Sequence, residues 1–327
     1  VQVKTAEQLD IARPDRNITR AAVEGWLPLE QAQALFAMAG QDLEAMKKAA
    51  LSRDFRPVPL GVTASITLRN TLRTVQSRNV IARLEGADPK LKDELVVYSS
   101  HWDAFGIGAE IGGEKVYHGA KDNAVAVAGL IEVGRAFAAS PTRPRRSIVL
   151  LAVTAEEQLL LGSSYYAQNP VYPLSKTLAN INLEMLNVHG PTRDLTIIGL
   201  GLSDLDDYAR DVLALQKRTL RPDPEPEKGM YYRSDHFSFA REGVPALEPE
   251  EGVDFVGKPA GFAEQVRAAY IANDYHKPSD KVKPDWDLSG GVMDLQAYWL
   301  IGYRVAQAEK FPEWKPGVEY KVRREAK

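Results

Sequence analysis

A short, nearly continuous apolar run at Ser147–Thr154 (SIVLLAVT) constrains the fold of this chain more than any other feature. A strand with one solvated face alternates apolar and polar residues, whereas a strand buried on both faces is apolar throughout. Similar runs recur along the chain, and the segments between them carry apolar residues at helical spacing. The expected strands are Leu95–Ser99, Ser147–Thr154, Thr177–Met185, Leu195–Ile198 and Val244–Leu247. The expected helices are Ala124–Ala139, Leu160–Gln168, Asp204–Gln216 and Leu288–Ala308.

This alternation of strands and helices predicts an α/β fold. We expect a three-layer αβα sandwich with a mainly parallel mixed sheet. Right-handed crossovers place the carboxyl ends of parallel strands at one edge of a sheet, which is where α/β proteins bind their ligands. Polar residues that follow the strands are therefore the first candidates for a functional site.

The first 60 residues form a different region. Their apolar spacing predicts helices at Leu29–Met38 and Leu43–Leu51. We therefore divide the chain into a helical N-terminal segment, residues 1–60, and a main domain, residues 61–327. Val62–Leu68 and Asn79–Leu84 read as two further strands at the start of the main domain.

Composition excludes several classes of protein. The chain has no cysteine, so a metal would be held by histidine and carboxylate side chains. A net charge of −3 gives no basic surface for nucleic acid. No apolar run reaches the ~18–20 residues of a membrane span. The first ten residues have no signal-peptide core, and because the chain starts at Val1 we expect a processed or truncated product whose leader precedes it.

Three candidate groups follow predicted strands or begin a helix. His101 and Asp103 come directly after the strand at 95–99, and residues two apart on an extended chain face the same way, so Asp103 could orient the His101 ring. Asp122 precedes the apolar helix, where a helix cap is the simpler interpretation. Glu156 and Glu157 follow the buried strand; two adjacent carboxylates there need a compensating charge such as a metal, unless they form a solvated turn.

Three more groups lie further along the chain. Glu184 lies in or just after an apolar strand, where it is either an exposed strand end or a carboxylate with a partner. Tyr275 and His276 belong to a YHKPSD loop in which Asp280 could orient His276, although a loop histidine is more often simply exposed. The YYRSDH segment, with Arg233 and His236, opens a short helix and could also be a cap.

Together these groups supply two histidines and four carboxylates along the chain. Imidazole and carboxylate ligands suit zinc, and a bridging carboxylate allows two metals to share one water. The single-zinc H-E-x-x-H helix and the G-x-S-x-G serine elbow are both absent from the sequence. This pattern of ligands is therefore compatible with a zinc site of two ions.

The order and context of these motifs resemble the M28 family of zinc metallopeptidases, which includes bacterial leucyl aminopeptidases, glutamate carboxypeptidase and glutaminyl cyclase. The resemblance runs from about Asn79 to the C-terminus. The segments that carry it are SSHWDAFGIG, YHGAKDNA, LAVTAEEQLLLGS, NLEM, YYRSDHFSFAREGVPAL and YHKPSD. It implies a zinc-exopeptidase (phosphorylase/hydrolase-like) fold, a peptide substrate and two zinc ions per chain.

The resemblance also implies a role for each residue. His101 and Glu184 would bind one zinc, Glu157 and His276 the other, and Asp122 would bridge them. Glu156 would be the general base, Asp103 would orient His101, and Tyr275 would be an oxyanion donor. Arg233 and His236 would line the substrate cleft. The bond after the bridging aspartate is often cis in this family, here Asp122–Asn123.

Three positions differ from the family pattern. Glu184 stands where an aspartate is usual, Val125-Ala126 replaces a hydroxyl residue and glycine, and Lys121 precedes the bridging aspartate, where we expect it to point away from the metals.

We expect an aminopeptidase. A carboxypeptidase, a cyclase-like enzyme or a non-catalytic binding module are the alternatives. Family habit implies a periplasmic or secreted location, and residues 1–60 would be the exit of an inserted or missing lid domain.

Overall fold

The computed structural model describes residues 8–15, 18, 21–67, 69 and 71–325. The chain divides into two compact units, Val1–Gln76 and Ser77–Lys327, so the division falls later than the expected boundary at residue 60. Every residue proposed for the metal site belongs to the second unit.

The first unit contains two of the expected helices, α1 (Leu29–Met38) and α2 (Leu43–Ala49). Asp42 caps α2 by accepting a hydrogen bond from the backbone N–H of Ala45 at 2.6 Å. Neither helix buries a residue. The strand expected at Val62–Leu68 is wrong for residues 62–67, which form no regular element, and Leu68 lies outside the described residues.

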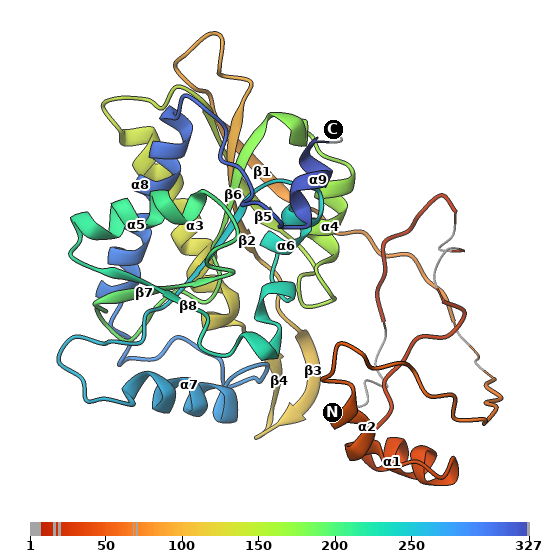
Figure 1. Ribbon diagram of the computed structural model, residues 1–327. Helices are drawn as coiled ribbons and strands as arrows, with labels where there is room; N and C mark the ends of the chain where they lie inside the picture. Colours follow the sequence, from red (N-terminus) through yellow and green to blue (C-terminus); the bar gives the residue numbers. More distant parts are fainter. Residues whose placement is uncertain (1–7, 16–17, 19–20, 68, 70, 326–327) are drawn as a thin grey trace. The chain divides into compact units, whose positions relative to one another are not determined.

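A seven-stranded mixed sheet is the centre of the second unit (Figure 1). Its spatial order is β1-β5-β2-β6-β9-β7-β8. The strands are β1 (Val80–Leu84), β2 (Leu95–His101), β5 (Ser147–Val153), β6 (Thr177–Asn182), β7 (Asp194–Ile198), β8 (Thr219–Pro222) and β9 (Ala246–Glu250). Strands β5, β2, β6 and β9 pair in parallel, whereas β1 and β7 run antiparallel to their neighbours β5 and β9. The expected α/β fold with a mainly parallel mixed sheet is confirmed.

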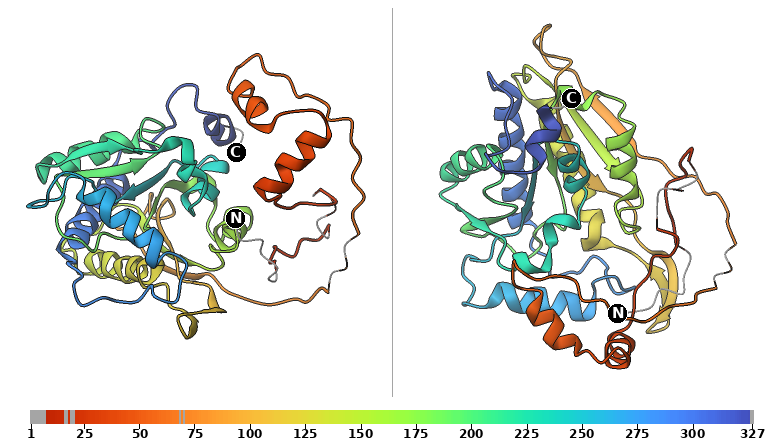
Figure 2. Two further views of the ribbon diagram at one scale, coloured as in Figure 1. Left: turned by 90° about the horizontal axis from the view of Figure 1, so that it is seen from below. Right: turned by 45° about the vertical axis from the view of Figure 1, so that its right-hand side comes forward.

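Helices cover both faces of this sheet. They are α3 (Val125–Ala139), α4 (Leu161–Gln168), α5 (Leu205–Leu215), α6 (His236–Arg241), α8 (Ser289–Gln307) and α9 (Tyr320–Glu325). A further helix, α7 (Phe262–Asn273), buries no residue and belongs to neither core. Alternate residues of β2 point to opposite faces: Val96 and Tyr98 pack in one core with α3, α5 and α8, and Leu95 and Val97 in the other with α4, α6 and α9. The right-hand view of Figure 2 shows the sheet between α8 and α4.

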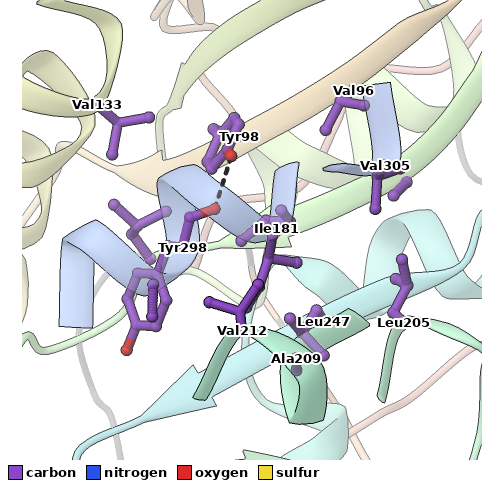
Figure 3. Packing of buried hydrophobic residues seen from close by; sticks show 14 of the residues in the cluster. Val96, Tyr98, Val133, Ile181, Leu205, Ala209, Val212, Leu247, Tyr298 and Val305 are labelled. Carbon is purple, nitrogen blue, oxygen red and sulfur yellow. Dashed lines mark hydrogen bonds between the residues drawn. The ribbon is translucent and has the colours of Figure 1, made fainter. Parts of the chain in front are cut away.

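Tyr98 ties the sheet to α8. Its side chain is fully buried, and its hydroxyl donates a hydrogen bond of 2.8 Å to the carbonyl of Tyr298 (Figure 3). Gly302 lies one turn further along α8, against the same hydroxyl, so that a Cβ at this position would overlap it. Glycine here allows the helix to approach β2 closely.

Several elements were not expected from the sequence. These are the hairpin β3 (Gly106–Ile111) and β4 (Glu114–Tyr117), the short strand β8, and helices α7 and α9. The residues of β3 are all exposed, so the core imposes no apolar pattern on them. Among the described residues no helix is both long enough and apolar enough to cross a membrane.

Candidate metal centre

Three neighbouring parallel strands bring most of the candidate residues together. His101 is the last residue of β2, Glu156 and Glu157 follow β5, and Glu184 follows β6. Because β5, β2 and β6 are adjacent and parallel, these side chains meet at one edge of the sheet. His276 lies in the loop between α7 and α8 and is thus the one histidine of the group that does not follow a strand.

The side chains form two groups that share Asp122. In the first, His101 Nε2 lies 3.2 Å from Asp122 Oδ1 and 3.1 Å from Glu184 Oε1. In the second, His276 Nε2 lies 3.3 Å from Asp122 Oδ2 and 3.2 Å from Glu157 Oε2. Each oxygen of Asp122 therefore faces a different histidine. Within each group the potential ligand atoms lie within 4.8 Å of one another.

Asp122 is held by its backbone. It lies in η1 (Ala120–Ala124), and the Asp122–Asn123 peptide bond is cis, as the resemblance implied. The backbone N–H groups of Lys121 and Asp122 donate to the Asp280 carboxylate at 3.0 and 3.1 Å. The expectation that Asp280 orients His276 is therefore not met: its carboxylate fixes the bridging segment instead.

Asp103 also acts differently from the expectation. His101 Nδ1 lies 3.1 Å from the backbone carbonyl of Asp103 and 3.7 Å from its carboxylate. The carboxylate accepts hydrogen bonds from the N–H groups of Glu156 and Glu157 at 3.1 and 3.3 Å. Asp103 thus orients His101 through its main chain and positions the Glu156-Glu157 turn through its side chain.

Burial and neighbouring carboxylates outweigh the nearby His101 in their effect on two glutamates at this edge. Burial, with the negative charge of Glu184, raises the pKa of Glu156 well above its usual range. Burial and the charge of Asp122 raise the pKa of Glu157 to about 9. A carboxyl group in such surroundings keeps its proton unless a cation lies beside it. A bound metal ion would supply that positive charge and lower the pKa of both glutamates.

For His101 and the shared aspartate, the neighbouring groups favour the charged form instead. Burial lowers the pKa of His101, but Glu184 and Asp122 outweigh it, so that the pKa lies well above the ordinary value. Burial raises the pKa of Asp122, but His101 and His276 outweigh it and bring the pKa to about 2. Asp122 is thus ionised and ready to bridge two positive centres.

The donor set and spacing fit zinc. Zinc is bound tetrahedrally by nitrogen and oxygen at ~2.0–2.2 Å, which separates its ligand atoms by ~3.4 Å. The histidine–carboxylate distances in the two groups, 3.1–3.3 Å, are close to that value. His101, Asp122 and Glu184 would hold one ion, and Asp122, Glu157 and His276 a second. The site would supply three protein ligands to each metal, which leaves room for water or substrate.

Glu184 is held by polar residues that its sequence context did not reveal. Its Oε2 accepts a hydrogen bond of 2.9 Å from Ser234, whose hydroxyl in turn accepts one of 2.8 Å from Asn182. Asn123 accepts a hydrogen bond from the N–H of Met185 and donates to the carbonyl of Leu183, which fixes the backbone on both sides of Glu184. These polar residues surround the longer glutamate side chain and hold one oxygen toward His101.

The other two departures from the family pattern do not disturb the centre. Lys121 is buried, but its Nζ lies 3.4 Å from Glu251 and 4.9 Å from the centre of the Tyr270 ring. The Lys121 ammonium group is therefore paired with Glu251 and points away from Asp122, as expected. Ala126 is fully buried in the core, and Val125 packs against it.

A cleft of about 360 Å³ opens beside the two groups. Glu156, Tyr275 and Arg233 line it. The Tyr275 ring stacks on His276 at a centroid distance of 3.7 Å, and burial with the charge of Asp122 raises the pKa of its hydroxyl, which stays protonated. The expectation for His236 is not met: its ring is fully buried and its Nδ1 lies 3.0 Å from Glu248 Oε2, behind the cleft wall.

The fold thus places two donor groups that could each hold a metal ion at the carboxyl edge of an α/β sheet. Comparison with protein families agrees: the model of Peptidase family M28 matches residues 79–300, and the chain belongs to that family. The family match includes all five residues of the two metal-binding groups.

Individual relatives are more distant. The chain is 30% identical over 133 residues to the Aminopeptidase NAALADL1 of Mus musculus, a match that covers 39% of this chain and 16% of that protein. It is 40% identical over 95 residues to a "Probable zinc metalloprotease" of Pyricularia oryzae, covering 29% of this chain and 18% of that one. The chain therefore spans less than a fifth of the length of these relatives.

Two solved structures have the same fold. A zinc aminopeptidase from Bacillus subtilis, BSAP, superposes with a TM-score of 0.50 at 18% identity, over 74% of this chain and 52% of that one. LapA from Legionella pneumophila gives a TM-score of 0.50 at 18% identity, over 70% of this chain and 57% of that one. The fold of this chain thus matches the folds of these two proteins over 70–74% of its length.

Proposed function

We propose that the protein is a two-zinc aminopeptidase that removes N-terminal residues from peptides. The observation that carries this proposal is the sharing of Asp122 by two donor groups, one oxygen to each. Names of relatives point the same way, since the mouse protein and the Bacillus structure are both called aminopeptidases. A location outside the cytoplasm stays a prediction.

Zinc at this centre would supply positive charge to polarise the substrate carbonyl and to lower the pKa of a bound water. Glu156 is the base of the proposed reaction. Its carboxylate lies 3.8 Å from His101 Nε2, lines the cleft and is not needed by either donor group. It would accept a proton from the attacking water and return it to the amine that leaves.

In this proposal, Tyr275 and Arg233 are the other two cleft residues that contact the substrate. The Tyr275 hydroxyl stays protonated beside His276 and would donate a hydrogen bond to the oxygen that gains negative charge at the scissile carbonyl. Arg233 lies on the same cleft and would contact the peptide beyond the cleaved bond.

Paired substrates test the aminopeptidase activity. The zinc-loaded chain should hydrolyse leucyl p-nitroanilide and leave N-acetyl-leucyl p-nitroanilide intact. Equal cleavage of both would contradict the requirement for a free amine.

The role of Glu156 can be tested separately. Glu156→Gln should lower kcat by about 10²–10⁴-fold, because it removes a positioned base, while the zinc content stays that of the parent chain. Full activity of Glu156→Gln at full metal content would refute the assigned base.

A further inference from the structure

A second pair of acidic side chains lines the cleft outside the metal centre. Glu248 and Glu250 lie on β9, two residues apart, so their side chains leave the strand on the same face. Neither belongs to the two metal-binding groups. The proposed reaction has no task for them.

Glu248 is a buried carboxylate with one oxygen free. Its side chain is 2% exposed, and Oε2 accepts a hydrogen bond of 2.8 Å from Asn182 and lies 3.0 Å from His236 Nδ1. Oε1 has no hydrogen-bond partner within the described chain. An unsatisfied buried carboxylate oxygen is costly, which favours a ligand that brings a donor into the cleft.

Glu250 has even less support from the protein. In the described ranges, its carboxylate makes no hydrogen bond or ion pair: Arg267, the nearest cation to affect it, faces Glu225 instead. Burial and the charge of Glu248 raise the pKa of Glu250 to about 8. Two neighbouring carboxyl groups in these surroundings favour the arrival of a cation.

The other residues that line the cleft suit a substrate side chain that is long and apolar with a charged end. Met230, Tyr232 and Phe237 give the cleft an apolar flank. Two exposed arginines also line the cleft. Arg233 Nη1 lies 3.6 Å from the Met230 sulfur, and the Arg241 guanidinium lies 5.7 Å from the centre of the Phe237 ring. The two arginines are thus exposed to solvent, whereas Glu248 is buried.

We propose that this cleft selects peptides whose N-terminal residue is lysine or arginine, with Glu250 and Glu248 as the specificity-determining carboxylates. The inference rests on the proposed exopeptidase function, because the same cleft contains Glu156 and His276. The aliphatic stem of the substrate side chain packs against the apolar flank, and its ammonium or guanidinium group meets the two glutamates.

Matched substrates test the selection. The zinc-loaded full chain should hydrolyse lysyl and arginyl p-nitroanilides with a kcat/KM at least about tenfold above that of the norleucyl compound, which has a similar stem and no charge. Glu250→Gln should remove most of that ratio, whereas Glu264→Gln, which replaces an exposed glutamate on α7, should leave the ratio unchanged.

Three results would overturn the proposal: no preference for the cationic substrates, a preference for glutamyl p-nitroanilide, or an equal loss of all substrates in Glu250→Gln. The last would mean that Glu250 acts on the α-ammonium group or on the fold. The specificity could then not be assigned to the substrate side chain.

A binding measurement separates this inference from the exopeptidase function. By titration calorimetry, n-butylamine should bind the full chain at least about tenfold more tightly than 1-butanol, and Glu250→Gln should abolish the difference. If no amide is hydrolysed but butylamine binds in this way, the exopeptidase proposal fails and the cation site stands. Equal binding of the two compounds overturns the cation site whatever the activity.

Discussion

At the scale of single residues, Glu184 shows how a side chain one methylene longer than the family pattern is accommodated. Ser234 donates to one of its oxygens and leaves the other 3.1 Å from His101. A residue that orients a metal ligand in this way contributes to affinity without touching the metal.

Replacement of Ser234 tests that support. Ser234→Ala should weaken zinc binding to the His101 group by about 10–100-fold, because Glu184 loses the hydrogen bond that orients it. Competition with a chromogenic chelator measures the affinity. Ser140→Ala, which removes a hydroxyl bonded to the Thr142 carbonyl at the end of α3, is the control and should leave it unchanged. Unchanged affinity in Ser234→Ala would show that Glu184 needs no such support.

Glu250 gives a pH dependence of stability. Its pKa is raised from 4.5 to about 8 in the folded protein, so between these values the unfolded carboxyl is ionised while the folded one keeps its proton. Stability must then fall as pH rises through this window. The free energy of unfolding of Glu250→Gln, measured relative to that of the parent chain, should therefore rise by ~2 kcal/mol between pH 5 and pH 8.5. This figure allows for the partial exposure of the carboxyl group.

Urea unfolding at these two pH values measures the gain, and Glu264→Gln is the control of equal charge change. A difference between Glu250→Gln and the parent chain that is the same at both pH values would contradict the assigned pKa.

The sequence predicted most of the centre and little of what surrounds it. His101, Glu156, Glu157 and Glu184 could be found because each follows an apolar strand whose direction is fixed by the alternation of strands and helices, whereas Asp122 and His276 were identified from the family resemblance. Contacts that depend on tertiary geometry could not be found: Asp280 reaches the backbone of Asp122, and Asp103 reaches the turn after β5. Glu248 and Glu250 had a detectable signal, alternate acids in a short strand, but their meaning depends on the cleft that they line.

At the scale of elements, the contact between β2 and α8 holds the strand that ends in His101. The fully buried Tyr98 occupies the space beside Gly302. Strands of this kind could be predicted from their apolar runs, whereas exposed elements such as β3 and β4 carry no such pattern.

Gly302→Ala tests this contact. The added methyl group would overlap the Tyr98 hydroxyl, and because the Tyr98 ring is buried it cannot move aside, so the free energy of unfolding should fall by about 1–3 kcal/mol. Gln296→Ala, on the exposed side of the same helix, should have little effect. Chemical denaturation compares the two variants, and a Gly302→Ala chain as stable as the parent would disprove the close approach.

At the scale of the whole molecule, the metal centre and both cores belong to the unit from Ser77 to Lys327. The α1 and α2 helices of the other unit bury no residue. The expected role of residues 1–60 as the exit of a lid domain stays a prediction.

A chain that begins at Ser77 should therefore fold and bind metal as the full chain does. Its melting temperature should lie within ~3 °C of the full chain's, since a loss of 1 kcal/mol shifts the melting temperature of a unit of this size by about 2–4 °C. Calorimetry and zinc analysis of both chains provide the comparison. Loss of zinc from the shorter chain would show that residues before Ser77 take part in the centre.

The central claim is that Asp122 joins two metal ions in one centre. Elemental analysis of the full chain, after zinc repletion and removal of the excess, tests it most directly. We predict about two zinc ions per chain, and loss of both in Asp122→Ala, since each ion would lose the shared ligand. One zinc ion or none in the parent chain, or two retained by Asp122→Ala, would contradict the shared centre.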